Sequence, residues 1–172
     1  MRRKRDGTPH LSCWALPTAA TQGWFQEAIE RFARISGTRA FVPHVTVLGD
    51  VSGWTHERVA AVLKDVPSFE VEMLQVDDED ARFRCVTLRA SPDPLVRLRA
   101  QLRSAMQSDD TEPYRPHLSL LYGERTTSQR REAIEAAGLP ASLPAATIGA
   151  VAVWDTSDLD WGSWRELDRW TL

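Results

Sequence analysis

Two copies of a short motif carry the side chains best suited to chemistry in this chain. Residues 41–48 read Phe-Val-Pro-His-Val-Thr-Val-Leu, and residues 114–121 read Tyr-Arg-Pro-His-Leu-Ser-Leu-Leu. Both follow one pattern: aromatic, any residue, Pro, His, aliphatic, Thr or Ser, aliphatic, Leu. The two histidines, His44 and His117, are two of only four in the chain and lie 73 positions apart. Such a match predicts two similar lobes related by a pseudo-twofold axis.

The spacing within each motif brings a histidine and a hydroxyl to one face. Side chains at i and i+2 of a strand point the same way, so His44 lies beside Thr46 and His117 beside Ser119. Imidazole titrates near neutral pH, so one histidine can act as a base and the other as an acid. Hydroxyls donate hydrogen bonds to phosphate oxygens. These two imidazoles and two hydroxyls together predict cleavage of a phosphodiester by in-line displacement. If each histidine were only a structural residue of its strand, no matched hydroxyl would be needed beside it.

A metal centre is the main chemical alternative, and the sequence argues against it. Zinc sites usually have three or four protein ligands, and no Asp or Glu lies at a motif spacing from His44 or His117. We therefore predict neither a metal nor another cofactor. Cys13 and Cys85 lie in apolar, strand-like runs without a CxxC partner, so we predict that both are core thiols.

At these motifs the sequence resembles the two-histidine (2H) phosphoesterases, whose hallmark is a pair of His-x-Thr/Ser-x motifs. It is most similar to the cyclic phosphodiesterases that open nucleoside 2',3'-cyclic phosphates and ADP-ribose 1'',2''-cyclic phosphate. The closer similarity lies in residues 12–17, 41–47, 83–86 and 113–122. The resemblance extends from about residue 11 to the C-terminus.

The resemblance implies a fold and a set of roles. The fold is α+β and bilobal, with two mostly antiparallel sheets facing a central groove and helices outside. No metal takes part. His117 is expected to activate water as the base, and His44 to protonate the departing ribose oxygen as the acid. Thr46 and Ser119 are expected to hold the phosphate oxygens.

Three aromatic residues are further candidates for binding the substrate. The resemblance places Tyr122 in the pocket, although an aromatic residue at a strand end is equally typical of a core. Phe83 is a candidate for stacking on a nucleobase, and Trp14 is a candidate for forming one wall of the groove. Arg39 and Arg115 precede the two motifs and are candidates for attracting a phosphate to this acidic chain.

Hydrophobic periodicity predicts the elements that position these residues. Alternating, β-branched runs predict seven strands, and apolar spacings of three and four predict four helices. The strands span residues 11–16, 44–49, 69–76, 83–90, 116–122, 147–154 and 164–171, and the helices span 21–36, 55–66, 93–107 and 128–137. We predict one bilobal domain over residues 10–172, preceded by a disordered basic tail over residues 1–9.

Composition limits the class of partner. The net charge is −3 and the pI is near 5.8, which argues against general binding of duplex nucleic acid. A small nucleotide with a cyclic phosphate, or an RNA 3' end, is the expected partner, which connects the protein to RNA metabolism. Neither a long apolar run nor a secretory signal is evident, so we expect a cytoplasmic protein that does not enter a membrane. The helix patterns show no exposed apolar face, so we expect a monomer. A 2H enzyme of RNA processing, similar to 2'-5' RNA ligases or RNA end-trimming enzymes, and a non-catalytic nucleotide-binding module remain as alternatives.

Overall fold

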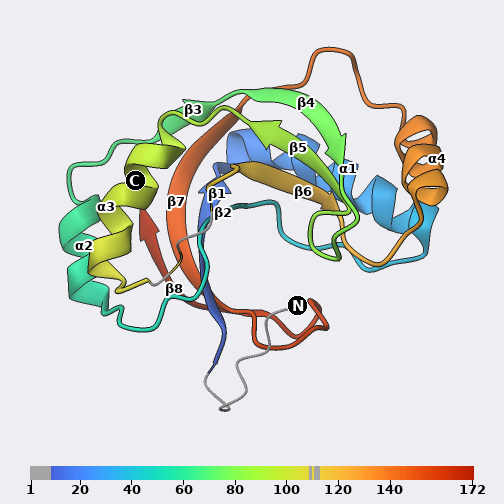
Figure 1. Ribbon diagram of the computed structural model, residues 1–172. Helices are drawn as coiled ribbons and strands as arrows, with labels where there is room; N and C mark the ends of the chain where they lie inside the picture. Colours follow the sequence, from blue (N-terminus) through green and yellow to red (C-terminus); the bar gives the residue numbers. More distant parts are fainter. Residues whose placement is uncertain (1–8, 109, 111–112) are drawn as a thin grey trace.

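The computed structural model describes residues 9–108, 110 and 113–172 (Figure 1). Of the predicted tail, only Pro9 lies within this part of the chain. The described residues form eight strands and four helices. The strands are β1 (Leu11–Pro17), β2 (Val45–Leu48), β3 (Phe69–Val71), β4 (Met73–Asp78), β5 (Val86–Ala90), β6 (His117–Leu121), β7 (Ala146–Asp155) and β8 (Arg165–Thr171). The helices are α1 (Ala19–Ser36), α2 (His56–Leu63), α3 (Leu95–Ala105) and α4 (Thr127–Ala137). The predicted α+β fold is confirmed.

The strands form one antiparallel sheet, and the curvature of β4 and β7 is visible in Figure 1. Its order is β3-β7-β1-β2-β6-β5-β4, and β8 pairs with β7. The two motif strands, β2 and β6, lie side by side and are joined at Val45 and Leu118. The two sheets predicted for the two lobes are therefore two halves of a continuous sheet, joined where the motifs meet. One half holds β1, β2, β3, β7 and β8, and the other holds β4, β5 and β6.

The strand predicted over residues 69–76 is divided into two strands that belong to different halves. β3 pairs with β7, whereas β4 pairs with β5. Between them, the backbone amide of Glu72 donates to the Ser91 hydroxyl at 3.1 Å, and the Ser91 amide donates to the Glu72 carbonyl at 2.9 Å. The alternating pattern predicted an extended segment correctly, but alternation does not specify which partner each part of it pairs with.

Local signals explain where the helices begin and end. α2 starts at Thr55, whose hydroxyl accepts from the Arg58 amide. A capping box formed by Thr126 and Gln129 is present at the start of α4, with both reciprocal hydrogen bonds formed. α1 ends at Gly37, which adopts the left-handed conformation with φ 61° that favours glycine.

The helices pack across the boundary between the two halves. α1 follows β1 but packs against β6 and α4, and α3 follows β5 but packs against β2 and α2. Phe25, Ile29 and Phe32 of α1 are fully buried in this core, and each contributes about 1.5–3 kcal/mol of hydrophobic stabilisation. Cys13 and Cys85 are buried free thiols, as predicted. Because α1 and α3 each pack against the half of the sheet that they do not follow in sequence, they hold the two motif strands in place relative to each other.

The two faces of the motif strands have different surroundings. Val45, Val47, Leu118 and Leu120 are buried in the main core with the helices. A second, smaller apolar cluster contains Trp14, Leu16 and Ala152. In the antiparallel register Trp14 lies opposite Thr46 on one side and Ala152 on the other, so this cluster shares the face of the motif hydroxyls. The motif side chains therefore lie on the face away from the main core.

Candidate active site

The two histidines make the same hydrogen bond to the backbone two residues earlier. His44 Nδ1 lies 2.7 Å from the Val42 carbonyl oxygen, and His117 Nδ1 lies 2.8 Å from the Arg115 carbonyl oxygen. A carbonyl oxygen can only accept, so Nδ1 carries the hydrogen in both rings. In the neutral state Nε2 then holds the free lone pair. Each motif therefore presents Nε2 for proton transfer.

His44 lies in a closed, aromatic environment. Its ring is 4% exposed and stacks on the Trp14 indole, with ring centroids 3.6 Å apart. The Tyr122 hydroxyl donates to His44 Nε2 at 3.3 Å. Burial lowers the pKa of His44 to about 4; the hydrogen bond to Val42 opposes this effect, and the nearby His117 adds to it. The free protein therefore holds His44 neutral at pH 7.

This pKa predicts an acid-sensitive contribution to stability. An unfolded histidine titrates near 6.5 and folded His44 near 4, so the unfolded chain binds the proton more readily between these values. The stabilisation is complete above pH 6.5 and is lost as the pH falls toward 4, up to about 3 kcal/mol. Denaturant unfolding of the wild type and His44→Asn from pH 7.5 to 4.5 checks this. The difference in their free energies of unfolding should shrink with acidification, and a constant difference would contradict the prediction.

His117 lies at the more open end of the site. Its ring is partly exposed, and its Nε2 has no protein partner among the residues that the structure describes. Burial lowers the pKa of His117, with a smaller lowering from Arg84, while the hydrogen bond to the Arg115 carbonyl and the charge of Glu79 raise it. His117 in turn lowers the pKa of His44, so the two imidazoles lie within electrostatic range of each other.

The hydroxyls of the two motifs are not equivalent, although the repeat suggests that they are. Ser119 is buried, and its hydroxyl donates to the Phe83 carbonyl oxygen at 3.1 Å. The Thr46 hydroxyl has no hydrogen-bond partner in the described part of the chain, and Thr46 is partly exposed. The Thr46 hydroxyl is therefore free to donate to a ligand, whereas the Ser119 hydroxyl must first break its hydrogen bond to the Phe83 carbonyl oxygen.

The three candidate aromatic residues lie around the motifs: Phe83 contacts Tyr122, and Trp14 stacks on His44. Tyr122 follows β6 directly, and its ring meets the edge of Phe83 at a centroid distance of 5.4 Å. Phe83 was predicted within a strand, but it lies in the turn before β5, where the chain reverses after β4. Burial raises the pKa of Tyr122, so its hydroxyl stays protonated and remains a donor to His44.

Sequence reasoning missed four further aromatic residues that complete an aromatic cluster around Tyr122 and Trp14. Phe41 stacks on Tyr122 at 3.8 Å and Trp154 stacks on Trp14 at 4.4 Å, while Trp161 and Trp164 contact Tyr122 from the loop after β7. Phe41 was detectable, because it is the aromatic residue of the first motif. The high frequency of tryptophans near the C-terminal hairpin was a second sequence feature that could have indicated these residues. We define the aromatic cluster as Trp14, Phe41, Phe83, Tyr122, Trp154, Trp161 and Trp164.

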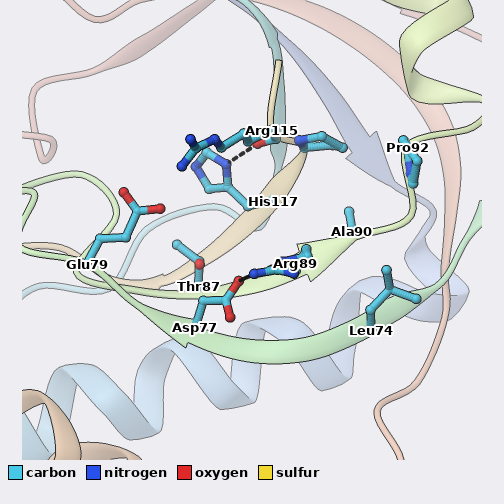
Figure 2. Close-up of a pocket in the computed structure, with 10 residues that line it drawn as sticks. Leu74, Asp77, Glu79, Thr87, Arg89, Ala90, Pro92, Arg115 and His117 are labelled. Atoms are coloured by element: carbon cyan, nitrogen blue, oxygen red, sulfur yellow. Dashed lines mark hydrogen bonds and ion pairs between the residues drawn. The ribbon is translucent and has the colours of Figure 1, made fainter. Parts of the chain in front are cut away.

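An open hollow begins on the other side of His117. Its volume is about 400 Å³, within the range of small-molecule sites. Figure 2 shows His117 and Arg115 beside it and strands β4 and β5 as its floor. The lining residues are Leu74, Asp77, Glu79, Thr87, Arg89, Ala90, Pro92, Arg115, Pro116 and His117. The site therefore joins a closed aromatic part at His44 to an open part at His117.

No group of three or more His, Cys, Asp or Glu side chains in residues 9–108, 110 and 113–172 is arranged to hold a metal ion. Over the same residues, none of the helices has the length and apolar character needed to span a membrane.

Comparison with known proteins identifies the family. Residues 39–160, more than half of the chain, match the model of the 2'-5' RNA ligase superfamily. The chain belongs to this superfamily of 2H phosphoesterases, as the paired motifs indicated. It is 30% identical to a cyclic phosphodiesterase of Arabidopsis thaliana over an alignment of 133 residues, which covers 73% of this chain and 72% of that protein.

Solved structures of E. coli LigT have the same fold. LigT complexed with 3'-AMP aligns with a TM-score of 0.58 at 16% identity, covering 95% of this chain and 97% of LigT. LigT complexed with ATP aligns with a TM-score of 0.57 at 18% identity, covering 95% and 98%. At these identities the likeness concerns the fold alone, and it agrees with the α+β architecture predicted from the sequence.

Proposed function

We propose that this protein is a metal-independent cyclic phosphodiesterase. Its substrate is a nucleoside 2',3'-cyclic phosphate or ADP-ribose 1'',2''-cyclic phosphate, and its product is a phosphomonoester. The observation that carries the proposal is the pair of imidazoles with matching Nδ1 hydrogen bonds, which leave Nε2 of both His44 and His117 as the nitrogen that can transfer a proton. The cyclic phosphodiesterase relative supports the same reaction class.

In the proposed reaction His117 is the base and His44 is the acid. Water attacks the phosphorus while His117 Nε2 removes its proton, the bond from phosphorus to one ribose oxygen breaks, and His44 Nε2 protonates that oxygen. The partly exposed, neutral His117 suits contact with water. The low pKa of His44 makes its protonated form a strong donor, and the negative phosphate favours that protonated form when substrate is bound.

The remaining side chains bind and orient the substrate. Thr46 and Ser119 donate to the non-bridging phosphate oxygens, and Trp14, Phe83 and Tyr122 offer aromatic surface to a nucleobase. Tyr122 also contacts His44 Nε2. When a phosphate binds, that nitrogen must exchange the tyrosine hydroxyl for the ligand. Substrate binding is therefore coupled to movement of Tyr122.

Phosphorus NMR of a nucleoside 2',3'-cyclic phosphate, incubated with the protein in excess EDTA, tests the reaction. The expected result is one monoester isomer from the wild type and no turnover by the His44→Ala, His117→Ala double variant. The isomer identifies the bond that breaks. Turnover that requires an added metal, or that survives in the double variant, would contradict the proposed mechanism.

Two other functions give different results in a matched binding assay. A non-catalytic nucleotide-binding module would bind product nucleotide without turnover in either the wild type or His44→Ala. An RNA-processing 2H enzyme, the reading that the superfamily name favours, would act on RNA ends and leave the free cyclic mononucleotide intact. The proposed enzyme loses turnover in His44→Ala while retaining measurable affinity for the nucleotide.

A further inference from the structure

The hollow beside His117 is separate from the aromatic cluster but continuous with the reaction site. His117 lines it, whereas none of the seven aromatic residues does. A nucleoside bound on the aromatic cluster with its cyclic phosphate between the histidines therefore leaves the hollow empty. The hollow is available to a group attached to the same nucleoside on the far side of His117.

The charges in the hollow nearly cancel except at Arg115. The Asp77 carboxylate pairs with Arg89 at 2.8 Å, and the Glu79 carboxylate pairs with Arg84 at 3.2 Å. The Arg115 side chain is exposed, and its guanidinium has no hydrogen-bond or ion-pair partner among the described residues. Arg115 thus provides a positive charge that no carboxylate of the described residues compensates, directly beside His117 (Figure 2).

A second hydrogen-bond donor lines the same hollow. Thr87 lines the hollow and lies opposite Ser119 in the β5–β6 register. Its hydroxyl has no partner within the part of the chain that the structure describes. A guanidinium and a free hydroxyl on one concave wall are suited to the oxygens of a phosphate group.

Away from the charged groups, the hollow is apolar. Leu74, Ala90 and Pro92 lie on the opposite side from Glu79 in Figure 2. Leu74 is 52% exposed, so its side chain is accessible to a ligand in the hollow. This floor offers contact to the sugar or base that follows a phosphate.

We infer that the hollow binds a second phosphate, carried on the 5' oxygen of the ribose that bears the cyclic phosphate, and that Arg115 is its main ligand. This inference rests on the proposed function, because the cyclic phosphate at the two histidines sets the position of the 5' oxygen. It favours substrates with a 5'-linked phosphate, in an RNA end or in a dinucleotide-like small molecule, over an isolated nucleoside cyclic phosphate.

The experiment compares adenosine 2',3'-cyclic phosphate with and without a 5'-phosphate. For the wild type, the 5'-phosphate should lower KM about 10-fold, the size expected for a charge-assisted contact. Arg115→Gln should lose this advantage, so that its KM values for the two substrates become equal within about 2-fold. Arg115→Lys should retain part of the advantage, because it keeps the charge but loses the planar fork.

Arg103→Gln is the matched control, since it removes the same charge from an exposed position on α3 outside the hollow. It should leave the KM ratio of the two substrates unchanged. Equal losses on both substrates in Arg115→Gln would overturn the inference and assign Arg115 to the reacting phosphate. A 5'-phosphate that gives the wild type no advantage would overturn it as well.

A binding measurement separates this inference from the proposed reaction. Adenosine 2',5'-bisphosphate and adenosine 2'-phosphate are titrated calorimetrically into the wild type and Arg115→Gln. Tighter binding of the bisphosphate by the wild type alone supports the subsite even if neither cyclic substrate is hydrolysed. Two further substrates, a dinucleotide ending in a cyclic phosphate and ADP-ribose 1'',2''-cyclic phosphate, then distinguish the RNA end from the small molecule by their kcat/KM values.

Discussion

Replacing His117 with alanine is expected to lower kcat/KM for a nucleoside 2',3'-cyclic phosphate by at least about 10²-fold, the usual contribution of a general acid or base. His44→Ala should cause a loss of similar size. The two side chains act in one proton-transfer sequence, so the double variant should be little worse than either single variant. Initial rates from phosphorus NMR or product chromatography provide the measurement.

The pH dependence of these variants identifies which histidine is the base. Catalysis requires one protonated and one neutral imidazole, so the pH dependence of wild-type kcat/KM should be bell-shaped. Its maximum lies on the acid side of neutrality, because the pKa of His44 is lowered to about 4 and that of His117 lies below its usual 6.5. In His44→Ala only His117 titrates, and the residual rate of a base rises with pH through its pKa. A residual rate that falls with pH would reverse the two roles.

Two controls separate catalysis from folding. His56→Ala removes an exposed histidine that pairs with Asp168 at 2.8 Å, and it should leave kcat/KM unchanged. His44→Gln preserves more of the volume that packs on Trp14 than alanine does. Normal activity in His44→Gln, or in a folded His117→Ala, would remove the basis for the proposed mechanism.

The second large effect is expected at Thr46. Valine has nearly the same shape as threonine and the same β-branched preference for a strand, so Thr46→Val removes little besides the hydroxyl. That hydroxyl is free to bind the phosphate in the structure. We expect kcat/KM to fall by about 10²-fold, comparable to the loss of one preorganised donor in other active sites. Steady-state kinetics together with circular dichroism of the folded variant check this prediction.

Ser119→Ala should behave differently because the Ser119 hydroxyl is already engaged. Its hydrogen bond to the Phe83 carbonyl is partly buried, and losing such a hydrogen bond costs about 0.5–1.5 kcal/mol of stability. We expect a smaller loss of kcat/KM than in Thr46→Val and a larger fall in the free energy of unfolding. The opposite ranking in both measurements would show that substrate binding makes the two hydroxyls equivalent.

Much of the site could be predicted because its residues occur as a local pattern. A period of two places His44 with Thr46 and His117 with Ser119 on one face, whatever the rest of the chain does. Helix ends can be predicted from the sequence for the same reason, since the capping box at Thr126 involves only residues three positions apart. The repeat also indicated that two strands of similar sequence meet at one site.

Contacts between distant segments were decided only by the tertiary structure. Residues 69–76 divide between two halves of the sheet because each part finds a different partner strand. The hydrogen bond from Tyr122 to His44 joins residues 78 positions apart, and the packing of Trp161 and Trp164 on Tyr122 depends on where the loop after β7 returns.

The asymmetry of the two hydroxyls arises in the same way, from the turn that brings the Phe83 carbonyl to Ser119 and leaves Thr46 free. The sequence by itself determined which side chains share a face and which chemistry they are suited to. The tertiary structure alone decided which of those groups are free, buried or bonded. Side-chain direction follows from local backbone geometry, whereas pairing and burial depend on segments that only the complete fold brings together.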